Sequence, residues 1–259
     1  MHVAGLAHVF NAGPKAELLF TQVNEDGTRN VAAAAAKAGV EHLVVISSVS
    51  VYGKHLARGC DETERCEPFG SYAKSKYNAE LRALEVSAQT GLKVTILRLA
   101  TLCGEGDPGN VGRLIQALER GRFIWIGRGD NRKSLLYACD AARACVAALR
   151  RPPKSPEIYN VSGPAITMRE IVEALSSDLG KTPPRLSLPA PLLLGAARVF
   201  AGCGFSKGRF VLLSLRKWLA DDVYSAEKIR EQLGFTAETS IRDALQREVK
   251  WYREQGVRK

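Results

Sequence analysis

The 259-residue sequence predicts an α/β fold: a doubly wound parallel sheet followed by a smaller C-terminal lobe. The prediction depends on two observations. Apolar runs at residues 43–46 and 94–99 have the composition of strands buried on both faces. Helical patterns at residues 14–38 and 71–89 alternate with these runs, as they do in parallel sheets.

The other elements follow from local signals. Gly39 ends the first helix, and Thr167 with Glu170 forms a capping-box pattern before a helix. The turn at residues 127–131 separates two short strands. We expect strands at residues 41–47, 123–126, 134–137 and 157–161, and helices at 110–120, 140–149, 167–179, 190–200, 225–233 and 240–255.

Composition limits the classes of partner. The net charge of +10 suits an anionic partner, but the basic residues are scattered and form no long run, so nucleic acid is not expected. The six cysteines form no Cys-x-x-Cys pair and the four histidines do not cluster with them, which argues against a metal site or a disulfide framework. Unpaired thiols suit a cytoplasmic protein. No apolar window is long enough to cross a bilayer, so no transmembrane segment is expected.

Three residues form a candidate acid/base site. Ser48 follows a predicted strand, at the carboxyl end where open α/β sheets place their sites. Tyr72 and Lys76 are four residues apart, on one face of a predicted helix. An ammonium near a phenol favours phenolate and lowers a pKa that is otherwise about 10. The pattern therefore predicts hydride-transfer chemistry on an alcohol or a ketone.

These residues stand in a longer pattern: Ser47-Ser48-x-x-x-Tyr52-Gly53, then Tyr72-x-x-x-Lys76, then Leu97-Arg98-Leu99. The pattern resembles the extended short-chain dehydrogenase/reductase family, the NAD-dependent epimerase/dehydratase group that includes UDP-glucose 4-epimerase-like enzymes. The resemblance implies a Rossmann-like fold and NAD as cofactor, with NADP not excluded. It implies that Tyr72 is the acid/base, that Lys76 holds the cofactor ribose, and that Ser48 holds the reacting oxygen.

The resemblance extends to cofactor residues. The segment at residues 1–7 is similar to the end of the family's fourth strand, which implies that Val3, Ala4 and Gly5 border the cofactor. Asn24 lies in a segment similar to the family's Asn-x-x-Gly-Thr-x-Asn, where the first Asn supports the site by hydrogen bonding.

The sequence contains no Gly-x-x-Gly-x-x-Gly phosphate loop. The resemblance therefore implies an N-terminally truncated domain that lacks its first βα units. Met1 is then either an internal methionine taken as a start or the beginning of a genuine remnant. We expect the chain as given to be inactive.

Substrate residues come from the same resemblance. Thr101 stands where the family often has an Asn that contacts the sugar nucleotide. Lys133 falls where an arginine often contacts the substrate diphosphate, and Arg132 is adjacent. The alternative is that both cations discourage strand pairing at the edge of a basic hairpin.

The residues after Ser48 separate the family's branches. Sugar dehydratases carry Asp-Glu at the position of Val49-Ser50, and another epimerase branch carries Cys at the position of Val49. What remains is an epimerase or oxidoreductase acting on a nucleotide-diphosphate sugar, or a 3β-hydroxysteroid dehydrogenase-like enzyme. The apolar helix after Pro189 resembles the steroid branch, whereas Arg132 and its basic neighbours favour a diphosphate. A non-catalytic fold remnant is a third hypothesis.

The predicted domains are a truncated NAD-binding Rossmann-like domain at residues 1–161 and a mainly helical substrate-binding lobe at residues 162–259. Residues 105–133 are expected to reach into the substrate lobe. The tail at residues 225–235 resembles the family's Ser-x-x-Lys-Ile-x-x-x-Leu-Gly-Phe ending. A nucleotide sugar is the expected partner, and a homodimer is allowed.

Overall fold

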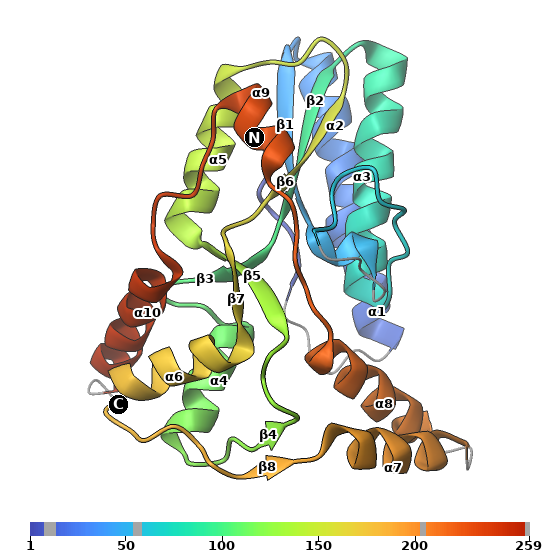
Figure 1. Ribbon diagram of the computed structural model, residues 1–259. Helices are drawn as coiled ribbons and strands as arrows, with labels where there is room; N and C mark the ends of the chain where they lie inside the picture. Colours follow the sequence, from blue (N-terminus) through green and yellow to red (C-terminus); the bar gives the residue numbers. More distant parts are fainter. Residues whose placement is uncertain (8–13, 54–58, 203–205, 257–259) are drawn as a thin grey trace. The chain divides into compact units, whose positions relative to one another are not determined.

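The computed structural model describes residues 1–7, 14–53, 59–202 and 206–256 (Figure 1). The chain divides into two compact units. The first comprises Met1–Leu102, Leu135–Pro164 and Tyr224–Ile241, and the second comprises Cys103–Ser134, Ala165–Val223 and Arg242–Lys259. Residues 105–133 belong to the second unit. Tyr224–Ile241, near the end of the chain, returns to the first unit, and the division into a cofactor domain at residues 1–161 and a substrate lobe at 162–259 stays a prediction.

A parallel sheet forms the centre of the first unit. Its strands are β1 (His42–Ser48), β2 (Lys93–Leu99) and β6 (Glu157–Val161), in the order β1-β2-β6. His2 adds a parallel bridge beside Val45: its N–H donates to the Val44 oxygen at 2.8 Å, and its oxygen accepts from the Ile46 N–H at 3.2 Å. The first residues of the chain therefore lie directly beside β1.

Helices cover both faces of this sheet (Figure 1). Successive side chains of a strand point to opposite faces. Leu43 and Val45 pack with α2 (Gly27–Lys37) and α3 (Ser71–Thr90). Val44 packs on the other side with α5 (Ala138–Arg150) and α9 (Glu227–Leu233). The predicted α/β fold is confirmed, and the apolar tail residues Ile229, Leu233 and Phe235 explain why the tail returns to the first unit.

The helix predicted at residues 14–38 is interrupted by a wider turn. It consists of α1 (Pro14–Phe20), a π-helical segment η1 (Thr21–Asp26) and α2. Such π segments occur mostly as single turns, frequently at functional sites. This one contains Asn24, the buried residue of the segment.

The second unit combines short strands with helices. Residues 132–134 of β5 (Arg132–Tyr137) pair antiparallel with β7 (Ala165–Thr167). The two-residue strands β4 (Trp125–Ile126) and β8 (Ser187–Leu188) pair in parallel. Its helices are α4 (Asn110–Glu119), α6 (Met168–Asp178), α7 (Ala190–Gly202), α8 (Ser206–Leu219) and α10 (Ile241–Gly256), whose first residue belongs to the first unit. β3 (Thr101–Cys103) crosses the division.

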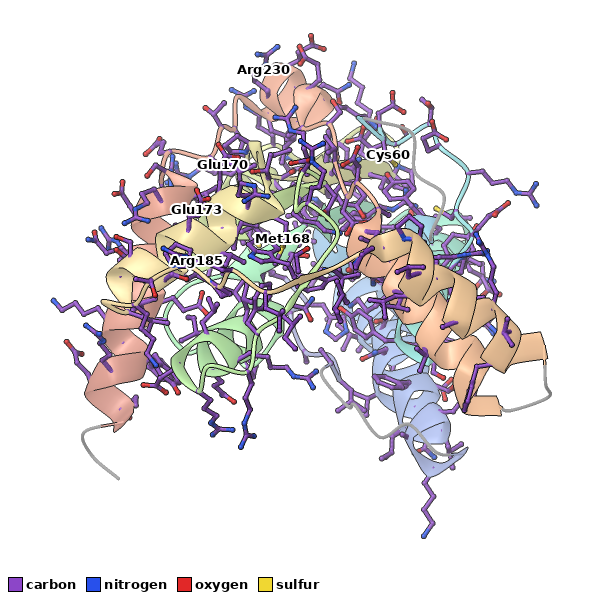
Figure 2. All side chains as sticks on the ribbon, turned by 60° about the horizontal axis from the view of Figure 1, so that its bottom comes forward. Cys60, Met168, Glu170, Glu173, Arg185 and Arg230 are labelled. Atoms are coloured by element: carbon purple, nitrogen blue, oxygen red, sulfur yellow. The ribbon has the colours of Figure 1, made fainter. Side chains whose placement is uncertain are left out.

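Two local outcomes bear on the predictions. The capping box of α6 is present: Thr167 Oγ1 accepts from the Glu170 N–H at 3.1 Å, and Glu170 Oε2 accepts from the Thr167 N–H at 2.6 Å. Figure 2 labels Met168, Glu170 and Glu173 on this helix. The sequence did not lead us to expect α8.

Among the described residues, no helix is both long and apolar enough to cross a bilayer. No group of three or more His, Cys, Asp or Glu side chains in the described ranges could hold a metal ion.

Candidate active site

The first unit brings Ser48 and Tyr72 together. Ser48 is the last residue of β1, and its extended backbone leads into a 3₁₀ turn, η2 (Val49–Tyr52). Its hydroxyl accepts from the Ser50 N–H at 3.2 Å and is hydrogen-bonded to the Tyr72 side chain. The turn ends at Gly53, where φ is 90° and an added Cβ would lie 2.2 Å from the Glu67 oxygen, so only glycine fits there.

Lys76 lies one helical turn beyond Tyr72, and its ammonium is buried. Only 8% of the residue is exposed, and Nζ donates to the Ile46 backbone oxygen of β1. Burial lowers the pKa of Lys76 to about 8, and the Glu80 carboxylate opposes this shift. The ammonium is therefore held at the strand by a neutral acceptor.

The pKa of Tyr72 differs from the sequence-based expectation. Burial raises it above the usual value near 10, and the hydrogen bond to Ser48 opposes the rise. The expected lowering by Lys76 is absent, because the desolvated ammonium is directed at the Ile46 carbonyl. Without bound ligands, Tyr72 is thus a neutral phenol.

Asn24 joins the start of the chain to the catalytic helix. Its Nδ2 donates to Ser75 Oγ at 2.9 Å and to the Leu6 oxygen at 3.0 Å, while Oδ1 accepts from the Leu6 N–H at 2.6 Å. Ser75 lies between the two catalytic positions of α3 and donates to the Tyr72 backbone oxygen at 2.8 Å. Both N–H groups of the Asn24 amide and its oxygen are thereby used to fix the segment at residues 1–7 against α3.

The residues expected to border NAD fit that cofactor. Val3, Ala4 and Gly5 are exposed. A Cβ added to Gly5 would lie 3.3 Å from Asn24 Oδ1 and 3.7 Å from Lys76 Nζ. Backbone without a side chain therefore lies directly beside the Lys76 ammonium, which suits a flat ring and ribose hydroxyls. The individual contacts of these residues with NAD stay predictions.

A buried ion pair supports this site, and the sequence analysis gave it no role. Glu80, one turn beyond Lys76, pairs with Arg98 of β2: the distance from Arg98 Nη2 to Glu80 Oε2 is 2.7 Å. Ser47 Oγ donates to Glu80 Oε1 at 2.5 Å. The sequence signal that could have revealed this pair is Arg98, a charged residue inside the apolar strand at residues 94–99, since a buried charge needs a partner.

The network continues from Arg98 to the third strand. The guanidinium of Arg98 lies 4.8 Å from the centre of the Tyr52 ring. The Tyr52 hydroxyl donates to Asn160 Oδ1 of β6 at 2.8 Å. The Tyr-Gly and Leu-Arg-Leu motifs thus contribute Tyr52 and Arg98 to one buried polar network that extends across β2 and β6.

The predicted substrate residues are divided between the units. Thr101 is half-buried at the start of β3, in the first unit. Lys133, in the second unit, is already engaged: Nζ lies 2.7 Å from Asp222 Oδ2 and 2.8 Å from the Ala220 oxygen. Arg132 is exposed, with Nη2 donating to the Ala165 oxygen at 2.7 Å. Of these two cations, Arg132 is the one that could also bind an anion.

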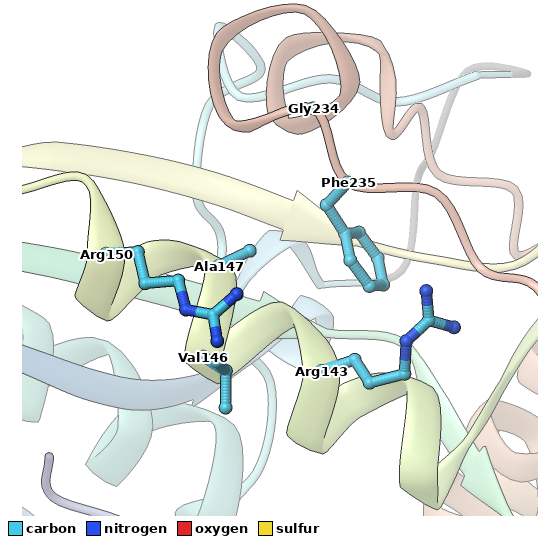
Figure 3. Close-up of a pocket in the computed structure, with 6 residues that line it drawn as sticks. All are labelled: Arg143, Val146, Ala147, Arg150, Gly234 and Phe235. Atoms are coloured by element: carbon cyan, nitrogen blue, oxygen red, sulfur yellow. The ribbon is translucent and has the colours of Figure 1, made fainter.

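A separate hollow lies beside α5, and none of the predicted site residues lines it. Figure 3 shows Arg143 and Arg150 of α5 on either side of it, with Phe235 opposite. Its volume is about 280 Å³. Arg143 is paired with Asp140 at 2.7 Å and with Glu238, so this guanidinium has a structural role.

Comparison with known proteins agrees with this geometry. The model of the NAD dependent epimerase/dehydratase family matches residues 1–162. The chain is 33% identical over 241 residues to N-acetyl-alpha-D-glucosaminyl-diphospho-ditrans,octacis-undecaprenol 4-epimerase of Escherichia coli O157:H7, covering 90% of this chain and 72% of the relative. It is 29% identical to UDP-glucose 4-epimerase of Vibrio cholerae, covering 74% of this chain and 60% of that enzyme's length.

A solved structure has the same fold. MoeE5 in complex with UDP-glucose and NAD is 25% identical and superposes with a TM-score of 0.75, covering 98% of this chain and 78% of that one. The chain belongs to the NAD-dependent epimerase/dehydratase family. The family prediction is confirmed, and so is NAD as the cofactor at the level of the family. The predicted inactivity of the chain as given stays a prediction.

Proposed function

We propose that the protein is an NAD-dependent 4-epimerase of a sugar linked to a diphosphate. The observation that carries the proposal is the arrangement of Tyr72, Ser48 and buried Lys76 at the carboxyl end of β1. Val49 and Ser50 support an epimerase over a dehydratase, since neither can supply the acid and base for loss of water.

Each residue has a defined task. Bound NAD supplies the hydride acceptor. Tyr72 takes the proton of the substrate carbinol at its phenolic oxygen, and Ser48 donates a hydrogen bond to the reacting oxygen. Lys76 would bind the ribose hydroxyls, and its charge would favour the phenolate of Tyr72. Burial raises the pKa of Tyr72 and Lys76 does not lower it in the structure without ligands, so the proposal requires that the ammonium turn from the Ile46 carbonyl toward the ribose and the phenol when NAD is bound.

Two carriers of the sugar are supported by different observations. A nucleoside diphosphate is supported by MoeE5, whose structure contains UDP-glucose, and by the Vibrio cholerae UDP-glucose 4-epimerase. A polyprenyl diphosphate is supported by the Escherichia coli relative, whose sugar is carried on diphospho-undecaprenol. Both carriers present a diphosphate, and the exposed guanidinium of Arg132 could bind it bidentately.

Replacement of the acid/base tests the reaction. In a form of the protein completed by the family's Gly-rich phosphate loop, incubation with NAD and UDP-glucose, UDP-N-acetylglucosamine or its polyprenyl counterpart should give the 4-epimer, which NMR detects. Tyr72→Phe should lower turnover by at least about two orders of magnitude, the usual contribution of a general acid/base. Tyr77→Phe, on the same helix, is the matched control and should keep its turnover. Full turnover of Tyr72→Phe would contradict the proposal.

A second variant separates a diphosphate substrate from a sterol. Arg132→Ala should raise KM for the diphosphate sugar by roughly tenfold or more, since a charge-assisted hydrogen bond contributes about 1.5–3 kcal/mol. Lys133 is a poor choice for this test, because its ammonium holds Asp222. A protein that oxidises a 3β-hydroxysteroid with unchanged KM in Arg132→Ala, and converts no sugar, would favour the steroid reading.

A further inference from the structure

The second unit presents an apolar stripe on α7. Leu192, Val199 and Phe200 are 71%, 68% and 56% exposed. Together with exposed Ala196, they occupy positions i, i+4, i+7 and i+8, which lie on one face of a helix. Figure 1 shows α7 and α8 side by side as a hairpin. Large apolar side chains gathered on one exposed helix face mark an interaction surface.

The charged residues within the α7–α8 segment are all of one sign. Residues 190–219, which comprise α7, α8 and their connection, contain five basic residues and no acidic one. Of these, Arg198, Arg216 and Lys217 have exposed side chains in the structure. An apolar helix face in a segment whose charged residues are all basic is typical of helices that lie in the interface of an anionic membrane.

The length of α7 decides between spanning and lying on a bilayer. Its thirteen residues extend about 20 Å, whereas the hydrocarbon core of a bilayer is about 30 Å thick. The helix is too short to cross, but it is long enough to place four apolar side chains side by side at the headgroup boundary.

We propose that the α7–α8 hairpin docks the protein on an anionic lipid surface. A second copy of the chain fits less well, because a two-fold contact through α7 would bring the same cations against each other without an acidic partner in residues 190–219. Anionic headgroups complement these cations, and the acyl boundary accepts the stripe. The inference goes beyond the proposed function and holds for either sugar carrier.

Sedimentation with lipid vesicles tests the inference on the whole chain. The protein should bind vesicles of phosphatidylethanolamine and phosphatidylglycerol, bind phosphatidylcholine vesicles much less, and dissociate as salt is raised. Leu192→Glu with Val199→Glu should reduce the partition coefficient by roughly tenfold or more. Arg216→Glu with Lys217→Glu should remove the preference for phosphatidylglycerol.

The matched control is a double variant of the first unit that adds the same two negative charges. Val31→Glu with Leu81→Glu replaces two exposed apolar residues of α2 and α3 and should bind vesicles nearly as well as the unchanged protein. Equal loss in this control, or no vesicle binding by the unchanged protein, would overturn the inference. So would a dimer in light scattering that Leu192→Glu with Val199→Glu converts to monomer. Epimerase activity of the form completed by the phosphate loop, measured on a nucleotide sugar without vesicles, separates these outcomes from failure of the proposed function.

Discussion

Two glutamates are buried to the same degree, one in each unit, and they are neutralised in different ways. Glu80 is 1% exposed and Glu248 is 2% exposed. Glu80 accepts from Ser47 and forms an ion pair with Arg98. Glu248, on α10, accepts only the Gly104 N–H at 3.0 Å through Oε2, and its Oε1 has no hydrogen-bond partner among the described residues.

The difference shows that partners, more than burial, decide the state of an acidic side chain. Burial, helped by the nearby Asp107 and Glu105 carboxylates and opposed by the Gly104 N–H, raises the pKa of Glu248 to about 8. Glu248 is therefore a protonated acid near neutral pH. Glu80 has a guanidinium in place and belongs to a charged network behind the active site. The contribution of Glu248 to stability therefore depends on pH, whereas that of Glu80 depends on its pairing with Arg98.

The largest expected effect is the loss of the Glu80 charge. Glu80→Gln keeps the shape but leaves the Arg98 guanidinium buried without a counter-charge, which should cost about 3–5 kcal/mol of unfolding free energy. Urea unfolding measures this. Glu85→Gln, at an exposed ion pair with Arg82 on the same helix, should leave the unfolding midpoint unchanged. A Glu80→Gln midpoint as high as that of the unchanged protein would break the comparison.

The next effect depends on pH and concerns Glu248. Its folded pKa of about 8 lies above the unfolded value near 4.3, so the folded state binds more protons between these values. Stability should therefore fall as pH rises from about 4.3 to 8, by up to about 1.4 kcal/mol per pH unit. Glu248→Gln should flatten this slope and raise the melting temperature at high pH.

Glu254→Gln on the same helix is the control for that slope. Glu254 is exposed, so its replacement should leave the pH dependence as it is. If Glu248→Gln destabilises the protein equally at pH 5 and at pH 8, the carboxyl is not a protonated acid and the contrast with Glu80 fails.

The smallest effect lies at the far end of the Glu80 network. Tyr52→Phe removes the hydroxyl that donates to buried Asn160, which should cost about 1–2 kcal/mol. The same urea titration measures it. We expect Tyr52→Phe to lose less unfolding free energy than Glu80→Gln, because the ion pair contributes most of the network's stability. An equal loss in the two variants would contradict this.

Much of the first unit could be predicted from the sequence. The strand at residues 94–99 and the helix beginning at Ser71 were found because their apolar periodicity is local, and Ser48 and Tyr72 were placed by their positions at element ends. The polar network was missed because the pairing of Glu80 with Arg98 depends on how α3 packs on β2, which no local pattern states.

The second unit was harder to predict for the same reason. Lys133 was expected to bind substrate, but Asp222, 89 residues away, approaches it only in the folded chain. The helix α8 gave no clear start signal, and its position beside α7 is a tertiary property. The capping box of α6 was predicted correctly, because Thr167 and Glu170 are three residues apart.

An isotope label on the substrate tests directly whether hydride transfer occurs at the Tyr72 site. A diphosphate sugar carrying deuterium at the carbon that is inverted should be incubated in ordinary water with NAD and the form of the protein that is completed by the family's phosphate loop. We predict that the 4-epimer keeps its deuterium at that carbon, because the hydride leaves and returns without exchange with solvent, while Tyr72 moves only the hydroxyl proton. Product in which that deuterium has been replaced by solvent hydrogen would contradict hydride transfer and the role given to Tyr72.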